Sequence, residues 1–195
     1  MSTFRVRLPF VLQRASFPMN AGNGSSHLCF VLGGARSGKS RLALTLAGNA
    51  LPRAFVATAE PGDEEMAARI RQHREDRDPT WETQEIPIDV SGWLKSKGVL
   101  YKTVVIDCLT LWLANLLGSG IQESKVLSSI DELMQSARTV PGSVVLVSNE
   151  VGLGIVPGDA VTRQFRDLAG AMNQRVAAAS DAVYLSVSGL PMQLK

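Results

Sequence analysis

The residues best suited to chemistry form one short stretch that follows the apolar run 28–32 and precedes a helix-like run. From Gly33 to Ser40 the sequence reads Gly-Gly-Ala-Arg-Ser-Gly-Lys-Ser, which fills every fixed position of the P-loop pattern. In such a loop, backbone N–H groups cradle phosphate oxygens, the lysine reaches the β- and γ-phosphates, and the last hydroxyl can bind Mg²⁺. The alternative is a glycine-rich turn without a ligand. We predict a nucleoside triphosphate site made by Gly33, Gly34, Ala35, Arg36, Ser37, Gly38, Lys39 and Ser40, with Lys39 also catalytic.

A carboxylate downstream has the sequence context of a metal-binding acid. The run 103–106 is rich in β-branched residues and ends in Asp107. This pattern is typical of a buried parallel strand that delivers an acid to the edge of a sheet. Such an acid holds Mg²⁺ directly or through water in P-loop proteins. A strand-end aspartate without a ligand is the alternative, but the upstream P-loop favours a Mg²⁺ site at Ser40 and Asp107.

One of the two histidines, His73, falls within a predicted helix over 63–74. It shares a helix face with Met66 and Ile70, a pattern that fits a histidine facing the core. Imidazole has an unperturbed pKa of about 6.5, so it is mostly neutral at pH 7 and is then able to attack phosphorus. The residues alone leave both interpretations open.

The elements that would position these groups alternate along the chain. Apolar runs predict strands, and helical periodicity predicts helices between them. This order indicates an α/β fold with a mostly parallel sheet and helices on both faces. A turn at Ser188-Gly189 predicts a C-terminal antiparallel hairpin. The predicted strands are 28–32, 53–58, 81–86, 103–107, 143–148, 181–187 and 190–194, and the predicted helices are 39–49, 63–74, 90–97, 109–117, 123–139 and 159–179.

Composition narrows the class of protein. The chain has 195 residues, 45% of them hydrophobic, and 20 basic against 18 acidic side chains. That balance gives no argument for a nucleic-acid partner. No apolar run reaches the roughly 18 residues of a membrane span, and the two cysteines fit buried thiols in the cytoplasm.

We expect one catalytic domain over 27–195 after a flexible leader at 1–26, although a targeting segment, a docking strand or an upstream start codon would explain the leader equally well.

Several stretches together resemble one family. They are 33–40, Ala57-Thr-Ala-Glu60, the 66–73 helix, Asp107-Cys-Leu-Thr-Leu-Trp-Leu-Ala-Asn-Leu-Leu117, Ser148-Asn-Glu-Val-Gly-Leu-Gly-Ile-Val-Pro157, Phe165-Arg-Asp-Leu-Ala-Gly170 and Asn173-Gln-Arg175. From about residue 27 to 195, the chain is similar to the bifunctional adenosylcobinamide kinase and adenosylcobinamide-phosphate guanylyltransferase family of cobalamin biosynthesis. The resemblance implies a RecA-like P-loop NTPase fold, a homotrimer, and GTP or ATP and a corrinoid as substrates.

The resemblance also implies two reactions. A nucleoside triphosphate phosphorylates adenosylcobinamide, and GTP then donates GMP to that phosphate through a GMP-histidine intermediate. The histidine at the family's position is His73. Gly158-Asp159 replaces the Glu-Asn expected after Pro157, but Asp159 can still cap the next helix. Further nucleotide-binding residues implied by the resemblance are Thr58, Ala59, Glu60, Arg74, Glu75, Asp76, Arg77, Glu85 and Asp107.

Two other functions fit part of the sequence. A P-loop kinase of small molecules would use the loop without nucleotidyl transfer, and its histidine would be structural. A nucleotide-dependent switch would bind without metabolic chemistry. The chain has neither an Asn-Lys-x-Asp motif nor an Asp-x-x-Gly sequence after the predicted metal-binding strand, and it has no basic stripe. These absences count against a GTPase switch and a DNA motor.

Overall fold

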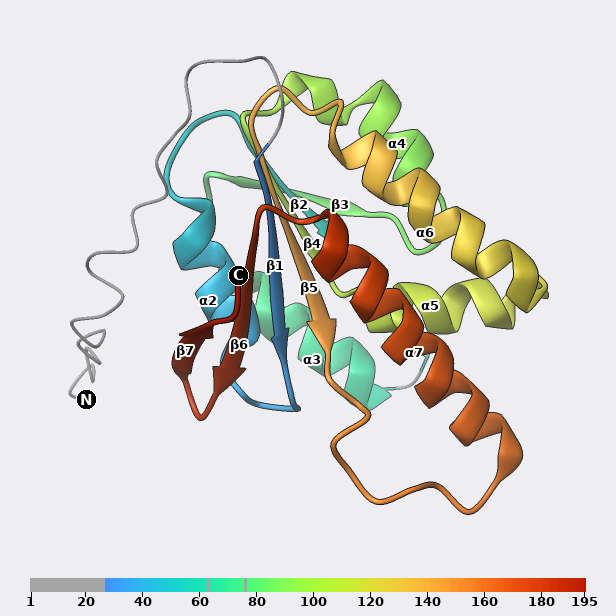
Figure 1. Cartoon of the computed structure of the whole chain (residues 1–195). Coiled ribbons are helices and arrows are strands. Elements are labelled where there is room, and N and C mark those ends of the chain that lie inside the picture. The colour runs from blue at the N-terminus through green and yellow to red at the C-terminus, as the bar shows by residue number, and fades with distance from the viewer. Residues whose placement is uncertain (1–26, 63, 76) are drawn as a thin grey trace.

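The structure, a computed structural model, describes residues 27–62, 64–75 and 77–195, and of Met66, Arg69 and His73 only the backbone. The predicted leader at 1–26 lies outside the described residues. Within them, seven strands form one sheet in the order β3-β2-β4-β5-β1-β6-β7 (Figure 1). All neighbours in this sheet pair in parallel except β6 and β7. The strands are β1 (His27–Gly33), β2 (Arg53–Ala57), β3 (Trp81–Glu85), β4 (Thr103–Asp107), β5 (Ser143–Asn149), β6 (Ala182–Val187) and β7 (Leu190–Gln193).

Helices connect these strands and cover both faces of the sheet. Figure 1 shows α2 on one side of the strands and the group α4, α6 and α7 on the other. A short 3-10 turn, η1 (Gly98–Leu100), leads into β4. The described helices are α2 (Lys39–Ala47), α3 (Glu64–Glu75), α4 (Val90–Ser96), α5 (Leu109–Gly118), α6 (Glu123–Ala137) and α7 (Ala160–Ala179).

Strand alternation divides the buried side chains into two cores. In β1, Leu28 and Phe30 face the core built with α4 to α7, whereas Cys29 and Val31 face the core built with α2. Successive strand residues point to opposite faces, so a strand covered on both sides must be apolar throughout. This explains why β1 and β5 read as continuous apolar runs rather than alternating ones.

The predicted α/β architecture is confirmed, including the antiparallel hairpin at the C-terminus. Every predicted strand and helix agrees with the structure within two residues at each end, and β4 agrees at both ends. Asp159 caps α7 as expected, since its Oδ1 accepts from the Thr162 N–H at 2.8 Å. The last two residues predicted for α2 and for α6 lie outside these helices, because α2 ends at Ala47, before Gly48 with φ 69°, and α6 ends at Ala137. Within the described ranges, no helix is both long and apolar enough to cross a membrane.

A cluster around Asp181 ties β1 to the end of α7 at the edge of the sheet away from the phosphate loop. Asp181 Oδ2 accepts from the Leu28 N–H at 2.7 Å, and its carboxylate accepts two bonds from the Arg138 guanidinium at 2.7 and 2.9 Å. Hydrogen bonding from Arg138 is the main reason that the pKa of Asp181 lies below its ordinary value. Burial opposes this shift, and the Leu28 N–H adds to it.

Replacing Asp181 with Asn should lower the stability of the fold and flatten its acid dependence. A carboxyl group with a depressed folded pKa binds protons more readily in the unfolded chain, so its contribution is present above pH of about 4 and is lost as pH falls through the folded pKa. Because the side chain is partly exposed, we expect a loss of roughly 1 kcal/mol at neutral pH. Urea unfolding from pH 2 to 7 measures both effects.

The matched control is Asp131→Asn, which removes an exposed ion pair with Arg175 that joins two helices at 2.6 Å. This variant should change the unfolding free energy by no more than about 0.5 kcal/mol. Equal pH profiles for the two variants would contradict the role given to Asp181.

Candidate active site

The register of the sheet gathers the predicted residues at the carboxyl ends of its parallel strands. Ala57, the last residue of β2, lies opposite Glu85 on one side and Asp107 on the other. Gly33, the last residue of β1, lies opposite Asn149 at the end of β5. In an open α/β sheet this edge is where ligands bind. The phosphate loop, the acid of β4 and the acid of β3 therefore share one edge.

The phosphate loop, which we define as residues 33–40, runs from the end of β1 into the first turn of α2. Its close packing requires glycine at its first position, because a Cβ on Gly33 would lie 2.3 Å from Ser37 Oγ and 2.7 Å from the Ser186 carbonyl oxygen. Gly38 has φ 90° and Arg36 has φ 56°, so two residues adopt the left-handed conformation that curls the loop. Lys39 Nζ donates to the Gly34 carbonyl oxygen at 3.2 Å, which places the ammonium group across the loop.

The lysine of the loop and the acid of β4 both influence the Cys108 thiol, which follows Asp107 in the sequence. Burial raises the pKa of the Cys108 thiol to about 11, the Asp107 carboxylate adds to this shift, and Lys39 opposes it. A thiol with a raised pKa is mostly protonated at neutral pH and is therefore a poor nucleophile. Lys39 and Asp107 thus both act electrostatically on Cys108, which is expected where a P-loop lysine and a strand-end acid share one edge.

Thr58 holds the backbone that carries Asp107. Its side chain is fully buried, its Oγ1 donates to the Cys108 carbonyl oxygen at 2.8 Å, and the same Oγ1 accepts from the Cys108 N–H at 2.9 Å. The Thr58 N–H donates to the Asp107 carbonyl oxygen at 3.2 Å. Asn115 Nδ2 in turn donates to the Thr58 carbonyl oxygen at 2.7 Å and to that of Pro87 at 3.0 Å. These bonds fix the segment after β2 to the segment after β4.

Basic side chains reach the same edge from the α3 side. The Arg74 guanidinium lies 3.8 Å from the Glu85 carboxylate, and both side chains are exposed. The Arg77 guanidinium packs 3.4 Å from the centre of the Phe55 ring and donates to Thr83 Oγ1 at 2.7 Å. Burial lowers the pKa of Arg77, whereas the Asp107 carboxylate opposes that shift. Arg77 is therefore a half-buried cation close to the acid of β4.

The other residues predicted for the site lie in the segment that follows β2 and in or just after α3 in the sequence. Glu60 and Glu75 are exposed, and Ala59 lies between Thr58 and Glu60 in the segment after β2. His73 lies in the last turn of α3, one residue before Arg74, and its side chain is outside the described part of the structure. Asp76 is outside the described residues altogether. The structure thus places the backbone of His73 beside an arginine that reaches the edge.

A buried polar network supports the loop after β5. Thr110 Oγ1 and Ser148 Oγ lie 3.0 Å apart, and Thr110 Oγ1 also accepts from the Asn149 N–H at 2.8 Å. Asn173 Nδ2 donates to the Asn149 carbonyl oxygen at 3.2 Å, and the Glu150 N–H donates to the Gly33 carbonyl oxygen at 3.1 Å. The loop that begins at Asn149 is therefore held directly against the start of the phosphate loop.

The donor set of this edge suits a Mg²⁺ ion carried by a nucleotide. In the part of the chain that the structure describes, no group of three or more His, Cys, Asp or Glu side chains could hold a metal ion. Mg²⁺ often uses one or two protein oxygens together with substrate phosphates and water. Ser40 in the first turn of α2 and Asp107 at the end of β4 are the residues that would supply two such oxygens. The edge fits Mg²⁺ only in combination with phosphate.

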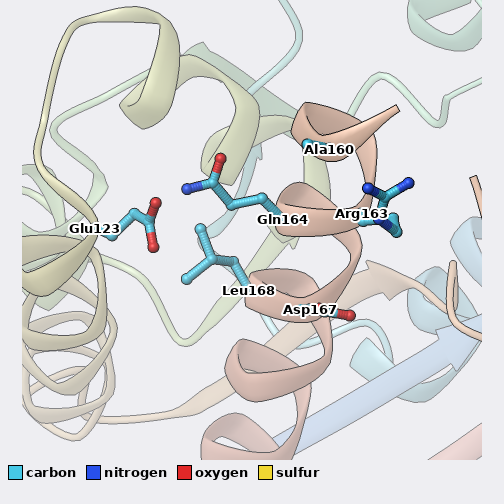
Figure 2. Close-up of a pocket in the computed structure, with 6 residues that line it drawn as sticks. All are labelled: Glu123, Ala160, Arg163, Gln164, Asp167 and Leu168. Atoms are coloured by element: carbon cyan, nitrogen blue, oxygen red, sulfur yellow. The ribbon is translucent and has the colours of Figure 1, made fainter. Parts of the chain in front are cut away.

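A separate hollow of about 640 Å³ lies between the start of α6 and the first half of α7. Figure 2 shows Gln164 and Leu168 pointing from α7 towards Glu123. None of the predicted site residues lines it. The hollow is lined by Glu123, Ala160, Arg163, Gln164, Asp167 and Leu168.

Sequence reasoning missed contacts between distant parts of the chain. It did not assign a role to Asn115, Thr110 or Asn173, whose polar atoms bind backbone groups at the edge. It also did not connect the C-terminal hairpin with the phosphate loop, although Ser186 and Gly189 both bind Ser37. In the sequence, such contacts are indicated by polar residues that interrupt apolar runs, as Asn115 and Ser186 do.

The parallel sheet, the phosphate loop and the terminal hairpin together have the P-loop NTPase fold of the RecA-like type. Among solved structures, the flagellar accessory protein FlaH from Methanocaldococcus jannaschii is similar in fold, with a TM-score of 0.52 at 11% identity over 89% of this chain and 80% of that one. A likeness at this identity shows the fold alone.

Sequence comparison identifies the family. Residues 29–194 match the family model of cobinamide kinase / cobinamide phosphate guanyltransferase. The bifunctional adenosylcobalamin biosynthesis protein CobP of Pseudomonas aeruginosa is 42% identical over 85% of this chain and 95% of its own length. The corresponding CobU protein of Salmonella typhimurium is 38% identical over 86% of this chain and 99% of its own. The chain belongs to this family of enzymes, which confirms the resemblance seen in its motifs.

Replacing Thr58 with Val should destabilise the protein although the two side chains have nearly the same shape. Valine cannot bond to the N–H and the carbonyl oxygen of Cys108, and each buried group without a partner costs about 1–3 kcal/mol. We expect a loss of roughly 2–4 kcal/mol, measured by guanidinium unfolding. Thr58→Ser keeps the hydroxyl and should lose about 1 kcal/mol. If the serine and valine variants were equally stable, the hydroxyl would not be holding this segment.

Proposed function

We propose that this chain is a bifunctional transferase of cobalamin biosynthesis that acts in the cytoplasm. It phosphorylates adenosylcobinamide with ATP or GTP, and it then transfers GMP from GTP to adenosylcobinamide phosphate. The observation that carries the proposal is the family match over residues 29–194, in a chain whose curated relatives are named bifunctional adenosylcobalamin biosynthesis proteins. The P-loop at the same edge as Asp107 supports the nucleotide part.

In the first reaction, the substrate hydroxyl oxygen attacks the γ-phosphorus of the triphosphate. A new P–O bond forms, the bond between the γ-phosphorus and the β-γ bridging oxygen breaks, and a nucleoside diphosphate leaves while the hydroxyl proton goes to solvent. Lys39 stabilises the charge on the β- and γ-phosphates, and the N–H groups of the loop orient them. Mg²⁺, held by Ser40 and by Asp107 directly or through water, would supply further neutralisation of the phosphate charge.

In the second reaction, an imidazole nitrogen of His73 attacks the α-phosphorus of GTP. A P–N bond forms, the bond between the α-phosphorus and the α-β bridging oxygen breaks, and pyrophosphate leaves. The phosphate oxygen of adenosylcobinamide phosphate then attacks the same phosphorus, the P–N bond breaks, and adenosylcobinamide-GDP is released with the histidine restored. Arg74 and Arg77 follow His73 in the sequence, and both lie close to acids of the edge. They would stabilise the charge that develops on the transferring group.

His73→Ala should abolish covalent labelling of the protein by GTP that carries label on its α-phosphate. A phosphoramidate is labile to acid and stable to alkali, so the label should show that behaviour in the wild type and be absent in the variant. His27→Ala replaces the other histidine, at the start of β1, and should keep the label. Transfer of γ-phosphate to adenosylcobinamide should persist in His73→Ala, because the phosphate loop is unchanged.

The same assay separates the proposal from its alternatives. If the wild type transferred γ-phosphate but took up no α-label, a small-molecule kinase would be the better account. Reversible nucleotide binding without either transfer would indicate a switch. Equal label in the wild type and in His73→Ala would remove His73 as the nucleophile.

We propose in addition that the chain assembles as a homotrimer. Four strongly exposed apolar side chains on the loop after β5 and at the start of α7 support an assembly that covers them, and they are Leu153, Ile155, Val156 and Val161. Sedimentation equilibrium should give about three times the chain mass of 20.9 kDa. Ile155→Asp, at the position that is 97% exposed, should lower that mass without changing the unfolding curve of the subunit. A monomeric wild type at micromolar concentration would refute the trimer.

A further inference from the structure

The turn of the C-terminal hairpin hydrogen-bonds to the phosphate loop at the carbonyl oxygen of Ser37. The Ser37 carbonyl oxygen accepts a hydrogen bond from Ser186 Oγ at 2.8 Å and another from the Gly189 N–H at 2.8 Å. Ser186 is 2% exposed, so its hydroxyl bond is shielded from water. The backbones are also close, because a Cβ on Gly38 would lie 3.2 Å from Gly189 Cα. The loop therefore rests directly on the turn of the hairpin.

The position of the hairpin is set by the sheet and not by the loop. Ser186 lies opposite Gly33 in the parallel pairing of β6 with β1, and Val187 lies opposite Leu190 across the turn. Ser188 and Gly189, the two turn residues, have φ 51° and 79°. Positive φ at both central residues is the requirement of the tight two-residue turn that matches strand twist. A rigid element thus presents the Ser186 hydroxyl and the Gly189 N–H to Ser37.

These two bonds determine which way the next N–H group points. The Ser37–Gly38 peptide is trans, so its C=O and its N–H point in opposite directions. Because the Ser37 carbonyl oxygen is held towards the hairpin, the Gly38 N–H is directed away from the hairpin. Phosphate loops bind their ligand through backbone N–H groups. A reversed peptide would instead present a carbonyl oxygen, which repels phosphate.

We propose that the β6–β7 hairpin presets the Ser37–Gly38 peptide for phosphate binding, with Ser186 and Gly189 as positioning residues that act through the Ser37 carbonyl oxygen. This inference rests on the proposed nucleotide site. It assigns a role in binding to a segment more than 140 residues away from the loop in sequence. The hairpin contributes pre-organisation, which lowers the free energy spent on ordering the loop when the ligand binds.

The test compares Ser186→Ala with Ser136→Ala by calorimetric titration of each variant with GTP, ATP and inorganic triphosphate in Mg²⁺. Ser136 is a matched control, since it is also buried and its Oγ also donates to a carbonyl oxygen, that of Glu132, at 2.7 Å. It lies in α6, on the other side of the sheet from α2. Ser186→Ala should raise the Kd of all three ligands by the same factor, about three- to tenfold, as expected for one lost hydrogen bond. Ser136→Ala should leave all three Kd values unchanged.

The equal effect on the three ligands assigns the lost interaction to the phosphates that all three share, and unchanged Kd values in Ser136→Ala exclude a general effect of removing a buried hydroxyl. If only GTP or ATP bound more weakly, the hairpin would act on the base and the proposal would be wrong. It would also be wrong if Ser186→Ala bound as tightly as the wild type, or if both serine variants weakened binding equally. These results would leave the proposed function intact, whereas a wild type that binds none of the three ligands would overturn the proposed function as well.

Discussion

The parallel pairing of strands is the constraint on which the site depends. Because β1 to β6 run the same way, their carboxyl ends must lie at one edge, and any polar residue that follows a strand is delivered there. Glu85, Asp107, Asn149 and the phosphate loop come from four different strands and meet only for this reason. The two apolar cores hold the register, since a shift of one residue would turn every buried strand side chain to the wrong face.

Positioning at this edge is achieved by buried polar groups that bind backbone atoms. Thr58 bonds to both polar backbone atoms of Cys108, Asn115 bonds to two carbonyl oxygens, and Thr110 accepts from the Asn149 N–H. Segments that leave a sheet have unpaired N–H and C=O groups, which are costly to bury. A side chain that satisfies such a group also fixes its place. The hydrogen bonds that satisfy the buried backbone groups of these loops therefore also hold the loops in place.

Local features of this structure were predictable from sequence, and contacts between distant segments were not. The run 103–107 combines β-branched residues with a terminal acid, so both its strand and its place at the edge could be predicted. The hairpin was likewise indicated by Ser188-Gly189. The bond from Ser186 to Ser37 spans 149 residues, and no spacing rule connects a serine in one apolar strand with a particular carbonyl oxygen elsewhere. The helix ends were predicted too far along α2 and α6, where Gly48 and the segment after Ala137 end the helical pattern early.

The two proposed reactions make different demands on one edge. Phosphorylation needs attack at the γ-phosphorus and guanylyl transfer needs attack at the α-phosphorus, with the β-phosphate between them. A P-loop holds the β- and γ-phosphates, so the α-phosphorus must be reached from outside the loop. Helix α3 is suited to this, because its last turn carries His73. The Arg74 side chain of the same turn extends to Glu85 on β3, the strand next to β2. Under the proposed function, the phosphate grip and the nucleophile therefore belong to separate elements, α2 and α3, and a change in one reaction need not disturb the other.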